Sequence, residues 1–305
     1  DRLVGSLCST IINHRTDEYG GSFENRIRFA LEVVDAIKRA SANITIDYKL
    51  PIVTVQPDGS LLGKGGLVVE EAMELAKHLE ERGVHMIHVA QANHTGNMND
   101  TIPAMGTRAY HFMEEECKKI KSCVSIPVST VGRISVDYAE KMIEEGTCEI
   151  VAFGRGLLAD PDIAAKLARG EKNLIRQCIC CNKGCTDAIM ASRAISCVLN
   201  AENGYEYERV ITKPNNKHKV LVVGGGVAGL EAARVASIKG HDVTVIEASD
   251  HLYGQINVAS LPPRKDEMLR ICKYFDEIIK SLNIKVLLNH PFNKAEADNY
   301  DDVIV

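Results

Sequence analysis

The sequence predicts an α/β protein in three parts: the C-terminal half of a (β/α)8 barrel, a cysteine-rich segment, and the start of a Rossmann-like nucleotide-binding domain. Short apolar segments alternate with amphipathic helical segments between residues 24 and 170, which is typical of a parallel sheet with helical crossovers. Five of the ten cysteines lie within residues 178–197, and a glycine-rich motif follows the apolar residues 220–223. We expect the three parts to span residues 1–171, 172–212 and 213–305.

Composition and charge narrow the class of protein. With 305 residues, 45% hydrophobic and 25% charged, the chain is long enough for two domains of ordinary globular composition. The net charge of −5, without blocks of like charge, argues against a nucleic acid or an anionic membrane as partner. No apolar run reaches the roughly 18–20 residues of a membrane span, and no signal peptide is recognisable, so we expect a cytoplasmic protein. Because the chain begins at Asp1 and stops inside the strand-like residues 301–305, we expect a fragment of a longer protein, with a homo-oligomer left open.

Four repeats of a strand followed by a helix, each about 35 residues long, predict the barrel wall. A complete (β/α)8 barrel needs about 250 residues and only about 170 precede the cysteines, so the prediction is half a barrel. An open doubly wound sheet has the same local pattern and is the alternative. The expected strands are 44–50, 85–90, 126–130 and 149–153, and the expected helices are 68–82, 113–121, 136–145 and 161–168.

Ligand-binding groups of such barrels lie at the carboxyl ends of the strands. Gly132-Arg133 and Gly154-Arg155 follow the last two expected strands, where glycine exposes backbone N–H groups and arginine offers a forked positive charge. This repetition predicts a phosphate site, with two surface arginines after glycine turns as the alternative. Lys49 lies within an apolar strand, where an unpaired charge is costly, so we expect it to meet an anion or a flavin carbonyl. His94, in the polar loop 91–97, is a candidate catalytic group, although a lone histidine is more often structural.

A dinucleotide-binding motif opens the third part. Gly224-Gly225-Gly226-Val227-Ala228-Gly229 fits G-x-G-x-x-G directly after the apolar strand 220–223. A helix over 230–239 and a strand over 242–246 follow, and Glu247 comes directly after that strand. Because strand, glycines, helix and acidic residue coincide, the signal is much more specific than the glycines alone.

The residues of this motif have distinct expected roles. Gly224 allows the tight turn, Gly226 lets the backbone approach a pyrophosphate, and Gly229 lets helix and strand pack closely. The helix N-terminus offers N–H groups and a positive dipole to the phosphates, and Glu247 can accept both ribose hydroxyls. The motif itself does not separate FAD from NAD.

The cysteine-rich segment has the spacing C-x2-C-x3-C-x11-C, formed by Cys178, Cys181, Cys185 and Cys197. Four thiolates brought together can bind a [4Fe–4S] cluster or a zinc ion, and the spacing does not decide between them. A redox-inert zinc would leave the barrel and the dinucleotide domain without an electron path, which favours the cluster. Cys180 is expected to be a packed, non-ligand cysteine, and the scattered ones are expected to be buried: Cys8, Cys117, Cys123, Cys148 and Cys272.

Two motifs carry a resemblance to a known family. Residues 13–26, N-H-R-T-D-E-Y-G-G-S-F-E-N-R, are similar to the N-x-R-T-D-x-Y-G-G-S-x-E-N-R signature of the old yellow enzyme superfamily. Residues 154–161 fit its G-R-x-x-L-A-D-P end of the barrel, and the cysteine spacing resembles that of its multidomain branch, which includes 2,4-dienoyl-CoA and 2-enoate reductases. Residues 252–255 resemble the G-G-Q segment of FAD-binding disulfide-reductase-like domains, although Tyr253 replaces the first glycine. The resemblance covers essentially the whole chain.

The resemblance implies cofactors and a residue set for each. Lys49 would contact FMN, and the FMN phosphate region would contain Gly132, Arg133, Gly154 and Arg155. The implied [4Fe–4S] ligands are Cys178, Cys181, Cys185 and Cys197, with Cys180 where relatives usually carry glycine. The implied FAD-contacting positions are Ala228, Glu247, Gln255 and Arg264, beside the motif glycines Gly224, Gly226 and Gly229.

The implied activity is reduction of an activated C=C bond. NAD(P)H would reduce FAD, electrons would pass through the cluster to FMN, and FMN would deliver hydride to an alkene conjugated to a carbonyl. His94 falls where relatives have a histidine near the substrate, whereas Arg2 occupies the usual tyrosine proton-donor position and is a poor acid. His94 or another group would then donate the proton, unless the substrate differs. The alternatives are an amine dehydrogenase, a steroid or bile-acid desaturase, or a non-redox zinc-stabilised nucleotide-binding module.

Overall fold

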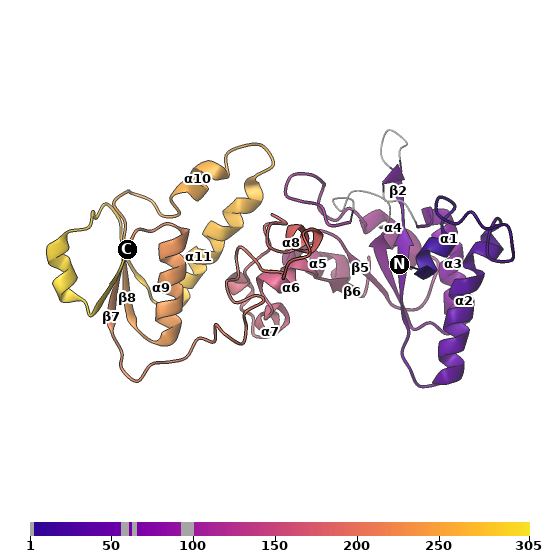
Figure 1. The fold of residues 1–305 in the computed structure, drawn as a ribbon, viewed down its shortest axis with the longest axis horizontal. Helices are drawn as coiled ribbons and strands as arrows, with labels where there is room; N and C mark the ends of the chain where they lie inside the picture. Colours follow the sequence, from indigo (N-terminus) through magenta and orange to yellow (C-terminus); the bar gives the residue numbers. More distant parts are fainter. Residues whose placement is uncertain (1–2, 56–60, 63–65, 93–100) are drawn as a thin grey trace. The chain divides into compact units, whose positions relative to one another are not determined.

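The computed structural model describes residues 3–55, 61–62, 66–92 and 101–305. The chain divides into two compact units, Asp1–Gly154 and Arg155–Val305. Figure 1 follows both units along the chain by colour and labels most of their helices and some of their strands. The first unit holds the four strands of the predicted barrel wall, and the second holds residues 155–171, which were expected to end the barrel, with the cysteine segment and the dinucleotide motif.

A four-stranded parallel sheet forms the centre of the first unit. Its strands are β1 (Asp47–Ile52), β4 (Met86–Gln91), β5 (Val128–Val131) and β6 (Ile150–Ala152), and they pair in the order of the sequence. An open doubly wound sheet would reverse direction at its first strand, whereas sequential neighbours are the pattern of a barrel wall. β1 begins later than predicted because Ile44 is 45% exposed and lies before the sheet.

Helices cover one face of this sheet. They include α3 (Val69–Glu81), α4 (Glu114–Lys121) and α5 (Val136–Glu144), and the apolar positions of α3 and α4 pack against Leu50, Ile87 and Val128 of the strands. Serine side chains cap two helices, as expected for N-caps: Ser22 accepts from the Asn25 amide and Ser135 from the Tyr138 amide. The unit also contains α1 (Leu3–Cys8), α2 (Phe23–Ala40), and the paired short strands β2 (Thr54–Val55) and β3 (Leu61–Leu62).

The opposite face of the sheet carries polar side chains among small apolar ones. Residues on a strand alternate between faces, so Asp47, Lys49 and His88 point away from the helices that bury Leu50 and Ile87. Lys49 is exposed among the described residues, and its contact with an anion or a flavin carbonyl stays a prediction.

The second unit begins with short helices. The expected single helix 161–168 is instead a pair, α6 (Arg155–Ala159) and α7 (Ile163–Ala168). The buried Asp160 separates them, because its carboxylate accepts from the amides of Asp162 and Arg176. The cysteine segment follows with only two short helical turns, η2 (Lys172–Leu174) and α8 (Thr186–Met190).

A second parallel sheet completes this unit. Its strands are β7 (Lys219–Val223), β8 (Asp242–Ile246), β9 (Lys285–Leu287) and β10 (Asp302–Ile304), in the order β10-β7-β8-β9. The order reverses at β7, the strand before the glycine motif, and such a switch point is where open α/β sheets bind ligands. Helix α9 (Val227–Lys239) packs on β7 and β8, and α11 (Leu269–Ser281) contacts α9. The remaining elements are α10 (Gln255–Ala259), η3 (Asp266–Met268) and η4 (Lys294–Asn299).

Among the described residues, no helix combines the length and the apolar character that crossing a membrane would require.

Candidate functional site

The carboxyl end of the first sheet carries the predicted phosphate residues of this unit. Gly132 has φ +137°, and a Cβ there would lie 2.9 Å from Cζ of Phe112. Arg133 also has positive φ, and it donates to the Ala104 carbonyl at 2.7 Å. Gly154 has no atoms within 4 Å of the position that a Cβ would take, so its backbone faces open space. His94 and Arg2 lie outside the described residues.

Sequence reasoning missed Arg108, which lies at the same end of the sheet. Its guanidinium donates to the Thr54 hydroxyl at 3.0 Å and to the Gln91 side-chain carbonyl at 3.3 Å. The same group lies 3.9 Å from the ring centroid of Phe112, a cation–π contact. Thr54 and Gln91 are buried, and the Thr54 hydroxyl also donates to the Gln91 side-chain carbonyl at 3.0 Å, so the arginine completes a buried polar network of three residues. The loop 101–112 has no periodicity, and only the charge within it could have drawn attention to this residue.

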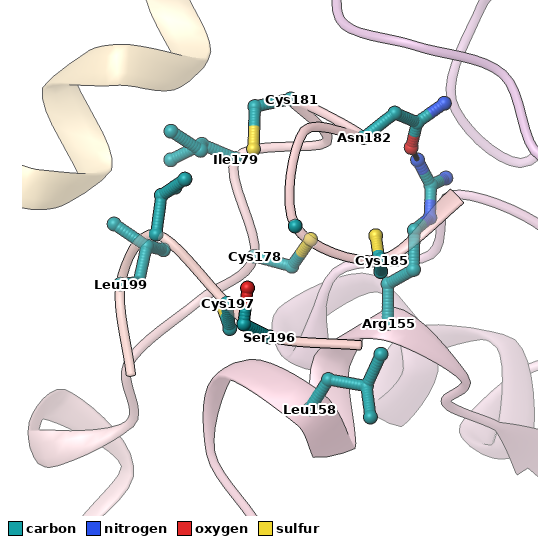
Figure 2. Close-up of a pocket in the computed structure, with 12 residues that line it drawn as sticks. Arg155, Leu158, Cys178, Ile179, Cys181, Asn182, Cys185, Ser196, Cys197 and Leu199 are labelled. Carbon is teal, nitrogen blue, oxygen red and sulfur yellow. Dashed lines mark hydrogen bonds between the residues drawn. The ribbon is translucent and has the colours of Figure 1, made fainter. Parts of the chain in front are cut away.

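The four cysteines of the C-x2-C-x3-C-x11-C spacing line one pocket. Figure 2 shows Cys178, Cys181, Cys185 and Cys197 around this pocket, which has about 310 Å³ of empty space, its opening included. Two segments of the loop meet at Gly184, where the Ser196 amide donates to the Gly184 carbonyl at 2.6 Å. A Cβ at Gly184 would lie 2.4 Å from the Ser196 carbonyl oxygen. This close backbone approach brings the last two cysteines of the spacing to the same pocket.

The environment of these thiols differs from one to the next. A hydrogen bond with Cys180 and burial raise the pKa of the Cys178 thiol, while the nearby Arg155 guanidinium opposes that rise. Burial raises the pKa of Cys181, and Cys185 and Cys197 are near enough to add to that effect. In the described parts of the chain, no three histidine, cysteine, aspartate or glutamate side chains are grouped so that they could hold a metal ion.

Cys180 is buried and lies between the lining cysteines in sequence. Its amide donates to Sγ of Cys178 at 3.3 Å, and its φ is +53°. A left-handed backbone favours glycine, which gives a physical reason for the glycine that the resemblance implied at this position.

Arg155 lines the cysteine pocket. Its Nη1 donates to Oδ1 of Asn182 at 2.6 Å, and Figure 2 shows the side chain reaching across to that amide. Asn182 has φ +60°, so the loop between the second and third cysteines is held in a tight turn by this contact. An FMN-phosphate role for Arg155 stays a prediction.

A second hollow lies beside the cysteine pocket in the same unit. It has about 550 Å³ of empty space, its opening included, and it extends from Cys197 to Val227 at the start of α9. Arg176 donates to the Tyr274 hydroxyl at 3.2 Å, and Arg270 donates to the Cys178 carbonyl. The cysteine segment is thus attached to α11 by two arginines.

The glycine motif forms the turn between β7 and α9. Gly224 has φ +103°, which favours glycine. A Cβ on Gly229 would lie 2.0 Å from the Gly224 carbonyl oxygen and 3.2 Å from Cγ1 of Val222, whereas a Cβ on Gly226 would meet nothing within 4 Å. The backbone is therefore closely packed at Gly229, whereas the space beside Gly226 is open.

The acidic residue after β8 contacts the same turn. Glu247 accepts from the amides of Gly225 and Ser249, both at 2.8 Å, and these bonds lower the pKa of its carboxyl. Tyr253 has φ +77°, its amide donates to the Gly225 carbonyl at 2.8 Å, and its hydroxyl donates to Asp276 of α11. Sequence reasoning noted Tyr253 only as a departure from G-G-Q.

The other predicted FAD positions are exposed: Ala228 in the first turn of α9, Gln255 at the start of α10, and Arg264 with φ +64°.

Two family descriptions match the chain. Residues 3–173 match the NADH:flavin oxidoreductase / NADH oxidase family, and residues 199–304 match pyridine nucleotide-disulphide oxidoreductase.

Individual proteins match over nearly the whole chain. A bilirubin reductase from Mediterraneibacter gnavus (strain CC55_001C) is 60% identical over 308 residues, covering 100% of this chain and 48% of that protein. A cinnamate reductase from Clostridium sporogenes is 33% identical, covering 99% of this chain and 47% of that protein. The solved complex of 2-naphthoyl-CoA reductase with 2-naphthoyl-CoA has a TM-score of 0.88 at 27% identity, covering 99% of this chain and 45% of that one. This chain therefore spans about half the length of the curated relatives that it matches.

Proposed function

The chain belongs to the NADH:flavin oxidoreductase / NADH oxidase family, and on that premise we propose that it is part of an enzyme reducing a carbon–carbon double bond conjugated to a carbonyl group. Electrons would come from NADH or NADPH. The named reductases among its relatives support this class, since cinnamate and 2-naphthoyl-CoA are both unsaturated groups conjugated to a carbonyl. The 60% identity to a bilirubin reductase makes a conjugated tetrapyrrole the first substrate to test.

FMN is the proposed cofactor of the first unit. Lys49 presents a positive charge on the uncovered face of the sheet, which suits the electron-rich edge of a flavin. Gly132, Arg133 and Gly154 at the strand ends offer backbone N–H groups and a guanidinium, and the space at Gly154 suits a phosphate. These residues fit FMN, which when bound would supply the hydride for the double bond. We propose Arg155 as a further phosphate contact.

A [4Fe–4S] cluster is the proposed group of the cysteine pocket. Four thiols line it, and a cluster takes one cysteine on each of its irons, so its ligands stand farther apart than those of a single zinc ion. Cys178, Cys181, Cys185 and Cys197 are the proposed ligands. The cluster would carry single electrons between the two flavin sites.

FAD is the proposed cofactor of the dinucleotide motif. Gly224 forms the turn, Gly226 leaves its backbone accessible, and α9 begins directly after Gly226, so the N–H groups of its first turn suit a pyrophosphate. Glu247 is the proposed ribose contact, since its depressed pKa keeps it an acceptor at neutral pH. The other proposed FAD contacts are Ala228, Gly229, Gln255 and Arg264.

Substrate protonation needs an acid from the protein or from water. We propose His94 for this role, because an imidazole can hold and release a proton near neutral pH. Arg2 stands at the usual tyrosine position, but an arginine stays protonated and is a poor proton donor.

One observation carries this proposal: a single chain joins a parallel barrel wall, four cysteines on one pocket and a dinucleotide-binding turn. The test is anaerobic turnover by the full-length protein with NADH or NADPH and a panel of bilirubin, cinnamate, cyclic enones, ketosteroids and methylamines. Oxidation of the nicotinamide that depends on an alkene supports the reductase. Turnover with methylamines alone would make the enzyme an amine dehydrogenase, and no turnover with any alkene would count against the proposal.

A further inference from the structure

A polar row crosses the uncovered face of the first sheet. The register pairs Lys49 of β1 with His88 of β4, His88 with Ser129 of β5, and Ser129 with Ile150 of β6. All four residues therefore stand at one level of the sheet, and their side chains share the face opposite the helices. Interior levels of such barrels are filled mostly by branched apolar side chains, so a row with lysine, histidine and serine departs from the rule.

His88 is the centre of this row. Its Nδ1 lies 2.7 Å from Oγ of Ser129, a short hydrogen bond between two adjacent strands. The imidazole is half-buried and Ser129 is 1% exposed, so the pair is largely shielded from solvent. Buried polar groups are costly unless they are hydrogen-bonded, and this bond satisfies Nδ1 of His88 and the Ser129 hydroxyl.

Among the described residues around His88, the charged side chains that face it all belong to β1. Asp47 and Lys49 stand on the same face of that strand, two positions apart, and the β5 neighbour Ser129 is neutral. Burial lowers the pKa of His88 below its ordinary value, Asp47 opposes the shift, and Lys49 adds to it. The lowered pKa favours the neutral imidazole, in which the serine hydroxyl can donate to Nδ1.

The level above the row is small and apolar. Pro51 and Ala90 are paired there, as are Val131 and Ala152. A long side chain from the level below can extend along these residues toward the carboxyl ends of the strands, where the predicted phosphate glycines lie. Lys49 is the long side chain of the row, and it is exposed.

We propose that His88 is a positioning residue for Lys49: held by Ser129, the neutral imidazole lets the Lys49 ammonium extend toward the strand ends and bind the flavin. This inference rests on the proposed function, which supplies the flavin as the partner of Lys49. Protonation of His88 would set a second positive charge beside the ammonium and cost it the hydrogen bond from Ser129. The ammonium would then turn away, and flavin binding would weaken.

The experiment measures FMN affinity of the full-length protein after removal of its flavin, by quenching of FMN fluorescence between about pH 5 and pH 8. In the natural protein, affinity falls roughly tenfold as the pH drops through the titration of His88, the scale expected for two like charges on adjacent strands. In His88→Asn this fall disappears. In Ser129→Ala it moves to higher pH, because the bond favouring the neutral imidazole is lost.

Two further variants serve as controls. His78→Asn removes a partly exposed histidine from helix α3, which lies on the other face of the sheet, and keeps the natural pH profile. His88→Gln provides a second neutral replacement should His88→Asn fail to fold, as judged by circular dichroism. Equal pH profiles in the natural protein and a folded His88 variant, or affinity that rises as pH falls, would overturn the inference while leaving alkene reduction intact. Absence of FMN binding at every pH would overturn the proposed function and this inference with it.

Discussion

Two alanine replacements in the glycine turn between β7 and α9 should distinguish a loss of folding stability from a loss of nucleotide binding. Replacing Gly229 by alanine sets a Cβ 2.0 Å from the Gly224 carbonyl oxygen, an atom of the backbone that cannot rotate away. The helix must move from the strand, since Val222 is also close at 3.2 Å. The matched replacement, Gly226→Ala, adds the same methyl group where nothing lies within 4 Å and where φ is −74°, a value any residue adopts.

The size of the effect follows from this geometry. Overpacking of a tight contact costs about 1–3 kcal/mol, and a backbone clash of this kind belongs at the upper end. For a unit of about 150 residues, each kcal/mol lowers the unfolding temperature by about 2–4 °C, so Gly229→Ala should lose about 6–12 °C. Gly226→Ala should change it by no more than about 2 °C, because a strain-free alanine costs no stability. Its methyl group nevertheless occupies the space in which a pyrophosphate would approach the backbone.

The assay is thermal unfolding of the full-length protein, followed together with its bound FAD. Gly229→Ala should lose both stability and FAD, whereas Gly226→Ala should keep its unfolding temperature and lose FAD. An unchanged unfolding temperature in Gly229→Ala would refute the packing argument. Loss of equal stability in both variants would show that open space at Gly226 was misjudged.

Three further predictions address other parts of the fold. Arg26→Leu should destabilise the first unit by about 2 kcal/mol in denaturant unfolding, because the buried guanidinium binds the Cys8 carbonyl and Glu71; a change below about 0.5 kcal/mol would contradict this. Gly184→Ala should lower the iron content of the anaerobically purified protein, because its Cβ would push apart the segments that bear the cysteines; full iron content would contradict this. His218 bonds Asp302 at 2.6 Å, which raises the histidine pKa, so the pair stabilises the fold below about pH 6.5 and loses that effect as pH rises through the raised value. Unfolding temperatures of His218→Asn and the natural protein should therefore differ at low pH and converge at high pH.

The sequence predicted architecture better than side-chain environment. Strand and helix periodicity, with the glycine motif, predicted parallel sheets in both units, because alternation and helix caps are local properties. The break at Asp160 was missed, because it depends on a bond to the Arg176 amide sixteen positions away.

In the candidate site, too, the sequence predicted what depends on local spacing and missed what depends on contacts between distant residues. Spacing predicted four cysteines in one place, and all four line one pocket. It could not predict that Arg155 reaches Asn182 beside them, because the two residues are distant in sequence and joined only by the fold. The hydrogen bond between His88 and Ser129 depends on strand register, which a single sequence does not specify.

The most direct test of the account is an elemental analysis of the anaerobically purified full-length protein for iron, acid-labile sulfide and zinc. The proposed electron path from FAD to FMN predicts iron and sulfide in equal amounts, both lost in Cys181→Ser. Stoichiometric zinc without sulfide would contradict that path and would leave the cysteine pocket a structural metal site.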